Sequence, residues 1–395
     1  MGVREELLEG RGGLPQLGAV VATGRGSLPF TLVDAAGVEV EPVSGFLRDL
    51  ALSDCSPLTV RSYAMDLLRW WRILAALQVD WRQATTDEVA VMVGWLRSAP
   101  NPQRRVAGDR PAVNPKTGKP VLQAGYAPAT INHALSVVSA FYTFHAQHGR
   151  GPVVNPVPVS SRRRALLAHR SPMEPMPLVR RAPLRQKQPE GPPRAIPDPL
   201  WDELFAALSC LRDRALLALY VSSAARASEL LGLSVDRIDW AGQRFWVVSK
   251  GSRLLEPVPA SPQALTLLGL YLDEAGLPEP GQPVWRTLRG EARTLSYWAL
   301  RRMLQRVNTR LGTNWTFHDM RHTAATRMAN DPALTLPQVQ TILRHRNIAD
   351  TLRYVRTDID ELFGRLQQHF RRPRAEEMRP AAGYASEDVA VVFGG

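Results

Sequence analysis

A proline-rich stretch in the middle of the chain places the strongest constraint on what this sequence can fold into. Residues 157–197 of the 395-residue chain hold nine prolines, nine lysines and arginines, and only two acidic residues, Glu174 and Glu190. Proline fixes φ and lacks the backbone N–H that helices and sheets use, so this density excludes regular secondary structure. The stretch is therefore expected to be an extended linker between two folded domains.

The charge of the chain points to the class of its partner. The net charge is +12 and the sequence pI is near 10.3, and the linker with its net +7 carries more than half of the excess. A protein this basic favours a polyanion such as nucleic acid. The linker is either a plain tether or a strap along the DNA backbone, and the local excess of charge favours the strap. Its candidate DNA contacts are Arg162, Arg163 and Arg164.

Several classes of protein are excluded by composition. Cys55 and Cys210 are the only cysteines, so neither a disulfide framework nor a cysteine-based zinc site is expected. No apolar run reaches the ~18 residues that a membrane span needs, and no signal peptide opens the chain. We therefore expect a cytoplasmic protein, which its basic charge would associate with the nucleoid.

The first 156 residues are expected to form a short extension and a helical domain. Residues 1–43 are rich in glycine, and residues 30–42 predict two short strands around Ala36-Gly37. Within residues 44–156, apolar residues recur at helical spacing in three segments, at 58–77, from 86 onward, and at 130–145.

A basic loop, residues 101–126, is rich in proline and glycine and interrupts this helical pattern. Such a loop either contacts DNA phosphates or is merely solvated, and the sequence does not favour one alternative over the other. The candidate contacts are Arg104, Arg105, Lys116 and Lys119.

The second domain, residues 198–370, mixes helical segments with one short sheet. Between Ile238 and Val258 the hydrophobic period changes from the helical value to two, which predicts a three-stranded antiparallel sheet. Lys250 stands at the tip of its second turn. A helix is expected over residues 358–370, followed by a basic tail, residues 371–395. The predicted fold class is mainly α with a small antiparallel sheet (α+β).

The stretch from Asn314 to Val355 contains the residues best suited to chemistry. His318 and Arg321 are three residues apart and share one helix face. His345 and Tyr354 are nine apart, so a continuous helix would place them on opposite sides. If both serve one site the helix must break, and Asn347 is a suitable N-cap for a new one. Two histidines, an arginine and a tyrosine together are able to bind and attack a phosphodiester.

Each of these residues alone is common on ordinary helices, but the combined pattern is specific. His-x-x-Arg-His, then Leu-x-His, then a tyrosine nine residues later resembles the tyrosine recombinase (phage integrase) family. The resemblance implies a helical core-binding, SAM-like DNA-binding domain over residues 44–156 and a catalytic domain over residues 198–370.

The resemblance also implies the roles of individual residues. The family's first arginine lies in a motif like Thr-Gly-x-Arg-x-Ser-Glu-Leu, and its lysine lies in the hairpin turn. The implied catalytic set is Arg226, Lys250, His318, Arg321, His345 and the nucleophile Tyr354, with Glu229 supporting the site from behind. Arg226 and Arg321 clamp the phosphate oxygens, and a lysine protonates the leaving 5′-hydroxyl. His318 is the expected base that takes the tyrosine proton, and His345 is a further donor to the phosphate. Because the phosphotyrosine keeps the energy of the phosphodiester, neither a cofactor nor a metal is expected. Ala224 and Arg344 stand where the family has glycine, which normally permits a sharp helix end.

The sequence thus predicts a site-specific recombinase or integrase of a mobile element, which cleaves and rejoins double-stranded DNA through a 3′-phosphotyrosine as a homotetramer on paired sites. One alternative is a DNA-binding protein that has this fold without catalysis. Another is a metal-dependent transposase, although no trio of carboxylates stands out.

Overall fold

The computed structural model describes residues 2–99, 113–121, 125–159, 182–188, 193–249 and 253–355, together with 367, 370 and 371. The chain divides into two compact units, Met1–Glu190 and Gly191–Gly395. Among the described residues, no helix is long and apolar enough to cross a bilayer.

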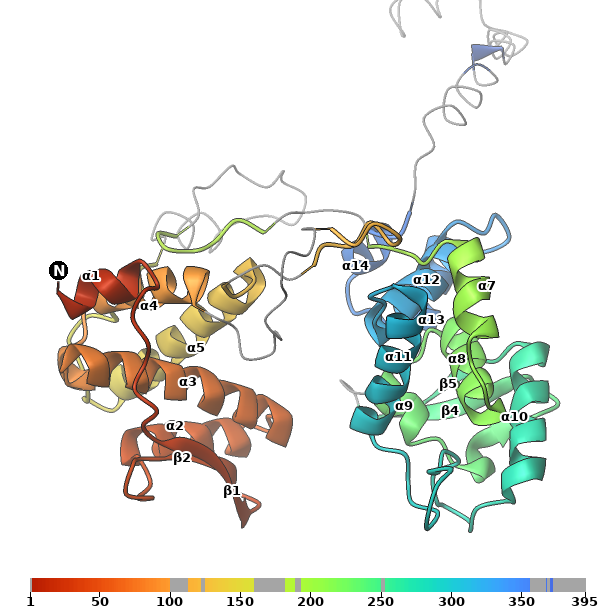
Figure 1. Ribbon diagram of the computed structural model, residues 1–395, viewed down its shortest axis with the longest axis horizontal. Helices are drawn as coiled ribbons and strands as arrows, with labels where there is room; N and C mark the ends of the chain where they lie inside the picture. The colour runs from red at the N-terminus through yellow and green to blue at the C-terminus, as the bar shows by residue number, and fades with distance from the viewer. Residues whose placement is uncertain are drawn as a thin grey trace, which may run out of the picture. The chain divides into compact units, whose positions relative to one another are not determined.

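The first unit is a helical bundle with a hairpin at its edge (Figure 1). The helices predicted at 58–77, from 86 onward and at 130–145 are confirmed as α3, α4 and α5. Each begins where the sequence supplies a start signal, such as the Ser56 side chain that accepts a hydrogen bond from the backbone N–H of Thr59 at 3.3 Å. The elements are α1 (Val3–Leu8), β1 (Ala19–Arg25), β2 (Leu28–Val33), α2 (Glu41–Leu52), α3 (Pro57–Leu77), α4 (Thr86–Ser98) and α5 (Pro128–Gln147).

Aromatic residues form the centre of this first core. The indole of Trp70 donates to the Tyr142 hydroxyl at 3.1 Å, and that hydroxyl donates to the Trp81 carbonyl at 2.9 Å. Phe141 packs edge-on against Trp81, with ring centroids 5.5 Å apart. Because each buried polar tip has a partner, these large rings bury their area without leaving an unsatisfied group.

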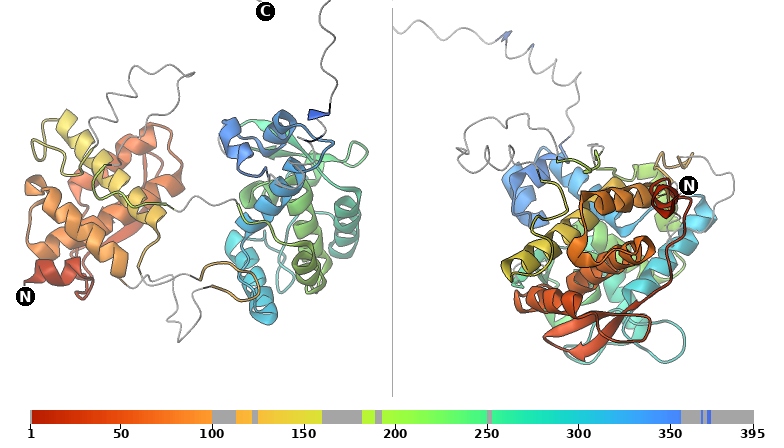
Figure 2. Two further views of the ribbon diagram at one scale, coloured as in Figure 1. Left: turned by 90° about the horizontal axis from the view of Figure 1, so that it is seen from above. Right: turned by 90° about the vertical axis from the view of Figure 1, so that its left-hand side faces the viewer.

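The N-terminal hairpin differs from its prediction. Its strands are β1 and β2, which pair antiparallel, and β2 packs against α2 and α3. The hairpin lies at the lower edge of the first unit in Figure 1 and in the right-hand view of Figure 2. The turn at Ala36-Gly37 exists, because the Asp34 carboxylate accepts backbone hydrogen bonds from Ala36 and Val38, but it closes only a single bridge, Val33 to Glu39. The chain enters α2 two residues later, so a second strand has no room.

The second unit is built around α8, which packs against α10 and α12. The predicted three-stranded antiparallel sheet is confirmed, in the order β3-β4-β5. The fold class is therefore mainly α with small antiparallel sheets, as predicted. The elements are α7 (Asp198–Ala206), α8 (Leu211–Ser223), α9 (Ala227–Leu231), β3 (Ile238–Asp239), β4 (Arg244–Val248), β5 (Leu255–Pro259), α10 (Pro262–Ala275), α11 (Tyr297–Leu311), α12 (Phe317–Ala329), α13 (Leu336–Leu343) and α14 (Ile348–Leu352).

Several predicted features lie outside the described residues. The linker is described only at 157–159, 182–188 and 193–197, where it contains neither helix nor strand. The predicted helix 358–370 is described only at Gln367 and Phe370, and the tail only at its first residue. The candidate residues outside the described ranges are Arg104, Arg105, Arg162, Arg163, Arg164 and Lys250.

The extension packs on the helical bundle through a close approach of α1 to α4. A Cβ on Gly94 would lie 2.4 Å from the carbonyl oxygen of Leu8, whereas one on Gly45 in α2 would meet only the flexible end of Glu41, at 3.8 Å. The Arg4 guanidinium, on α1, also pairs with the buried carboxylate of Glu88, on α4. The absence of a side chain at Gly94 thus permits this contact.

We expect Gly94→Ala to destabilise the protein by about 1–3 kcal/mol, because the new methyl group collides with α1 backbone. Gly45→Ala is the matched control and should stabilise by about 0.5–1 kcal/mol, since alanine is the better helix former where space allows. Urea unfolding measures both changes, and hydrogen exchange at residues 3–8 reports whether α1 detaches. Equal stabilisation by both substitutions would contradict the close approach.

Candidate active site

The guanidinium of Arg321 lies at the centre of the candidate site. It is held on α12, whose first turn is capped by reciprocal hydrogen bonds between Thr316 and Asp319. Only 6% of Arg321 is exposed, and its two terminal nitrogens donate to the backbone carbonyls of Ala224 and of Leu343, the latter at 2.6 Å. Burial, followed by the nearby arginine charges, lowers the pKa of Arg321 to about 10, so the group remains charged at neutral pH.

Two residues in the left-handed backbone region end the helices that meet at Arg321. Ala224 (φ 50°) ends α8 and Arg344 (φ 54°) ends α13. These are the positions where the family pattern has glycine, and both helices end sharply there although each residue carries a Cβ. His345 follows Arg344 directly and Arg226 follows Ala224 after one residue, so the two helix ends present them to the same region.

Arg226 and Glu229 form an ion pair at the start of α9. Nη1 of Arg226 donates to Oε1 of Glu229 at 2.8 Å, and the Arg226 backbone N–H donates to Oε2 at 2.7 Å. The arginine side chain is 32% exposed and the glutamate side chain only 1%. Burial would raise the pKa of Glu229, but these hydrogen bonds and the charge of Arg344 outweigh it and hold the pKa below its usual value. Glu229 is therefore an ionised, buried support, with Arg226 facing outward.

His345 is oriented by contacts on both of its ring nitrogens. Nε2 lies 3.5 Å from a terminal nitrogen of Arg321, and Nδ1 lies 3.0 Å from Oγ1 of the buried Thr351. Because arginine can only donate, Nε2 accepts, and the ring proton lies on Nδ1 and points to Thr351. Burial, and then the charge of Arg321, lowers the pKa of His345.

The predicted helix break before Tyr354 is confirmed. The chain turns after His345, and Asn347 caps the new helix α14 by accepting from the Ala349 backbone N–H at 3.0 Å. Tyr354, 7% exposed, then packs in a small apolar cluster with Ala224 and Leu343. Burial raises the pKa of Tyr354, against a partial lowering by Arg321.

His322, a residue for which the sequence predicted no role, contacts the tyrosine hydroxyl. Its Nδ1 lies 2.9 Å from Oη of Tyr354. His318 is exposed, and its ring centroid is 4.0 Å from that of His322. Burial, and then His318, lowers the pKa of His322 to about 4, so the ring is neutral at pH 7. The second histidine of the His-x-x-Arg-His motif was the available sequence signal.

The structure therefore brings together most of the predicted catalytic residues. Arg226, Arg321, His345 and Tyr354 converge with Glu229 behind them, and His318 lies one ring further out. Among the described residues, no group of three or more histidines, cysteines and carboxylates is placed to hold a metal ion. Of the predicted DNA contacts, Lys116 is exposed and Lys119 half-buried, in a turn of the first unit.

A basic face on α11 was also missed from sequence. This helix contains four arginines and no acidic residue. Arg301, Arg302 and Arg306 are exposed, and Arg301 lies over the exposed ring of Trp298, 5.6 Å from its centroid. Arg302 and Arg306 are one helical turn apart and so share one face of the helix. This spacing was the signal in the sequence for a basic helix face.

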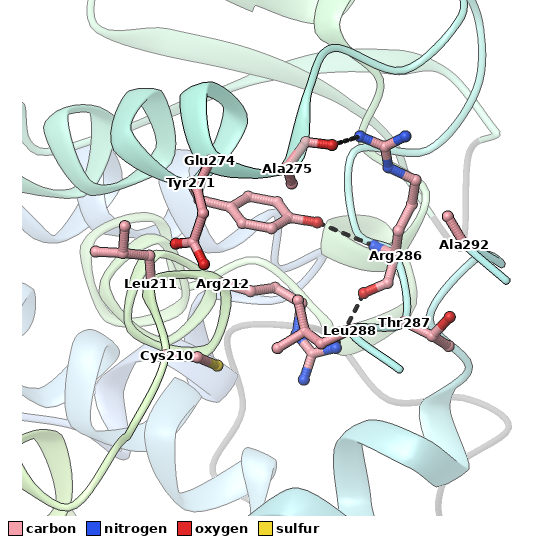
Figure 3. A pocket seen from close by; sticks show the side chains of 10 residues that line it. All are labelled: Cys210, Leu211, Arg212, Tyr271, Glu274, Ala275, Arg286, Thr287, Leu288 and Ala292. Atoms are coloured by element: carbon pink, nitrogen blue, oxygen red, sulfur yellow. Dashed lines mark hydrogen bonds between the residues drawn. The ribbon is translucent and has the colours of Figure 1, made fainter. Parts of the chain in front are cut away.

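A small pocket of about 210 Å³ lies at the start of α8 (Figure 3), whereas Ala224 follows the end of that helix. The pocket is lined by the start of α8, the end of α10, residues 286–288 and Ala292. Because α8 has 13 residues, the pocket is roughly 20 Å from Ala224. The pocket is therefore separate from the candidate active site, and Arg212 in it is paired with Asp213 at 2.7 Å.

The sequence is similar to known proteins along both units. Residues 201–361 match the phage integrase family, and residues 43–113 match the phage integrase N-terminal SAM-like domain. The tyrosine recombinase XerC of Pelobacter propionicus is 31% identical over 176 residues, which are 42% of this chain and 56% of that protein. XerC of Myxococcus xanthus is 26% identical over 329 residues, 78% of this chain and 89% of that protein. The chain spans about half the length of the first of these relatives and of two further XerC recombinases.

Solved structures show the same fold. A lambda integrase (75–356) dimer bound to a COC′ core site has a TM-score of 0.55 at 15% identity, covering 81% of this chain and 98% of that chain. The XerH site-specific recombinase bound to difH has a TM-score of 0.52 at 14% identity, covering 92% of each. With both family profiles matched in order along the chain, the protein belongs to the phage integrase family of tyrosine recombinases.

Proposed function

We propose that this protein is a site-specific DNA recombinase that cleaves and rejoins strands through Tyr354. One observation carries the proposal: the Tyr354 hydroxyl is hydrogen bonded to a neutral histidine, His322, and its ring stacks 6.1 Å from that of His345, which contacts the buried Arg321. Attack on a phosphodiester requires a nucleophile, a proton acceptor and positively charged groups that bind the phosphate oxygens.

The charges of the site suit a phosphodiester passing through a pentacoordinate state. The outward-facing guanidinium of Arg226 would bind the non-bridging oxygens, with Arg321 adding positive charge from beneath. Oη of Tyr354 forms the new bond to phosphorus while the bond to the 5′-oxygen breaks. The 5′-oxygen takes its proton from an acid, for which Lys250 is the candidate. The 3′-phosphotyrosine keeps the energy of the original ester, so rejoining is the same step in reverse.

His322 is the proposed acceptor of the tyrosine proton, in place of His318. The pKa of the imidazole is about 4 and that of the phenol is above its ordinary 10, a gap of at least about six pKa units. Free tyrosinate therefore does not accumulate, and proton transfer must accompany attack. A bound phosphate would not remove this gap, because its negative charge raises the pKa of a neighbouring phenol as well as that of a neighbouring imidazole.

The proposed chemistry also sets the assembly and the biological role. Recombination of two duplexes requires four strand cuts, so four copies of a one-tyrosine enzyme must act together on paired sites. Integration of a mobile element into a chromosome is the proposed role. Its support is the similarity to XerC recombinases and to structures of an integrase and a recombinase bound to their DNA sites.

The test of the proposed function is a covalent adduct on a nicked suicide substrate, which traps the tyrosine on the DNA. We expect wild-type protein to form the adduct in EDTA, and Tyr354→Phe to form none while binding DNA normally, since only the nucleophilic oxygen is removed. Denaturing electrophoresis resolves the adduct. Cleavage that disappears in EDTA and returns with magnesium would instead favour a carboxylate-metal transposase.

His322→Asn should slow adduct formation by roughly 100-fold at saturating protein, because the amide can keep the hydrogen bond to Tyr354 but cannot take the proton. Single-turnover cleavage measures this effect, and His148→Asn in the first unit is a surface control. An unchanged rate in His322→Asn would show that another group is the general base, and His318 would be the first residue to test.

The same histidine predicts a dependence of stability on pH. The unfolded chain binds a proton at His322 near pH 6.5, whereas the folded protein does so only near pH 4. Stability therefore falls as the pH is lowered through this window. Because the ring is partly exposed, we expect a contribution of about 1 kcal/mol, which His322→Asn should remove. Urea unfolding between pH 4 and pH 7 measures the difference between the two proteins.

The arginine face of α11 predicts a salt dependence of DNA binding. If Arg302 and Arg306 bind phosphates, replacing both with glutamine should reduce the slope of log K against log salt by about 0.9 for each phosphate that is no longer neutralised. Arg293→Gln is the matched control, because that exposed arginine is already paired with Glu291 at 3.0 Å. Slopes equal to the wild-type value in both variants would exclude α11 from the DNA interface.

A further inference from the structure

Arg344 departs from the family pattern and yet is built into the site. It occupies the left-handed position at the end of α13, where glycine is conformationally favoured. Its side chain is only 6% exposed, so it does not extend into solvent as a surface arginine would. A buried guanidinium on a residue with a disfavoured backbone conformation must have strong partners, because otherwise the end of α13 would rearrange.

The main partner of Arg344 is the carboxylate that also holds Arg226. A terminal nitrogen of Arg344 donates to Oε2 of Glu229 at 2.5 Å, while Oε1 of the same carboxylate accepts from Arg226 at 2.8 Å. Glu229 thus lies between two guanidinium groups that come from distant parts of the sequence. A second carboxylate, Glu256 on β5, has Oε2 3.9 Å from Nε of Arg344.

The charge balance around Glu229 depends on Arg344. With a glycine at this position, the ion pairs of Glu229 within the described part of the chain would be reduced to the one with Arg226, and the carboxylate would neutralise that arginine. With Arg344 present, Glu229 is shared between two guanidinium groups and neutralises Arg226 only in part, while Glu256, 3.9 Å from Nε of Arg344, compensates part of that second charge. The uncompensated charge of Arg226 faces outward, because its side chain is 32% exposed and that of Arg344 is 6% exposed.

We propose that Arg344 is a positioning residue that balances the charge of Glu229, so that the positive charge of Arg226 is less compensated by its carboxylate partner and acts on the DNA phosphate. The same contact joins the backbone turn before His345 to the turn that carries Arg226. The inference rests on the proposed function, since it assigns Arg226 to a phosphodiester. Glycine would relieve the backbone but remove the countercharge.

The first experiment measures the ion pair by thermal unfolding of full-length protein. Arg344→Gly should lower Tm by on the order of 10 °C, because it leaves a buried carboxylate with one partner fewer. Glu229→Gln, Arg344→Gly and the double variant form a cycle, and the double variant should lose clearly less than the sum of the single losses. Gln243→Gly is the matched backbone control, since Gln243 is exposed and also left-handed (φ 50°). Additive losses would overturn the pairing.

The second experiment measures single-turnover adduct formation on the nicked suicide substrate, at saturating protein and well below every Tm. Arg344→Gly should slow the reaction roughly 10- to 100-fold with half-site affinity within about threefold of wild type. Arg344→Lys should recover part of the rate, and adding Glu229→Gln to Arg344→Gly should make it faster than Arg344→Gly alone. Gln243→Gly should react as wild type.

The outcomes distinguish a failure of the role inferred for Arg344 from a failure of the proposed recombinase function. A wild-type rate in Arg344→Gly, or no gain on adding Glu229→Gln, would overturn the positioning role while the recombinase assignment stands. If wild-type protein forms no adduct, the proposed function fails and the role of Arg344 toward a phosphate fails with it. The unfolding cycle then still decides whether Arg344 and Glu229 are coupled.

Discussion

The candidate site depends on one buried guanidinium that donates to two backbone carbonyls. Arg321 donates to Ala224 and Leu343, the last residues before two helix ends turn away. A charged donor to a buried carbonyl is among the stronger hydrogen bonds available to a protein, and leaving either carbonyl without it would cost about 1–3 kcal/mol. Arg321 thereby sets the separation of the segments that carry Arg226 and His345. Arg321 both holds the two segments together and supplies positive charge to the site. Its substitution should therefore affect folding as well as cleavage.

The two helix ends reach this arrangement without the glycines that would make it easy. A non-glycine residue in the left-handed region costs roughly 1–2 kcal/mol. At Ala224 the methyl group is wholly buried in the cluster that contains Tyr354, so packing offsets the conformational cost. At Arg344 the side chain reaches Glu229 and adds a buried ion pair. Each departure from glycine therefore couples backbone geometry to a residue of the site.

Burial also sets the protonation states. His322 and Tyr354 are hydrogen bonded to each other, and desolvation lowers the pKa of the first and raises the pKa of the second. Both are consequently neutral over the physiological range. In the proposed reaction the tyrosine would lose its proton only while its oxygen attacks a phosphate bound by the arginines. The site is thus arranged to be inert until its substrate arrives.

Much of this architecture was determined by local sequence. Apolar spacing located α3, α4, α5 and the three-stranded sheet, and the N-capping residue Asn347 located the helix break before Tyr354, because periodicity and capping are decided within a few residues. The hairpin was misplaced, since most of β1 is exposed and its sequence AVVATGR shows no alternation of apolar and polar residues. Only the tertiary structure decided that His322 and not His318 meets the tyrosine, and that Arg344 shares Glu229 with Arg226. Those pairings join residues 32 and 115 positions apart, and the packing of helices against one another, not the spacing along any one of them, selects the partner.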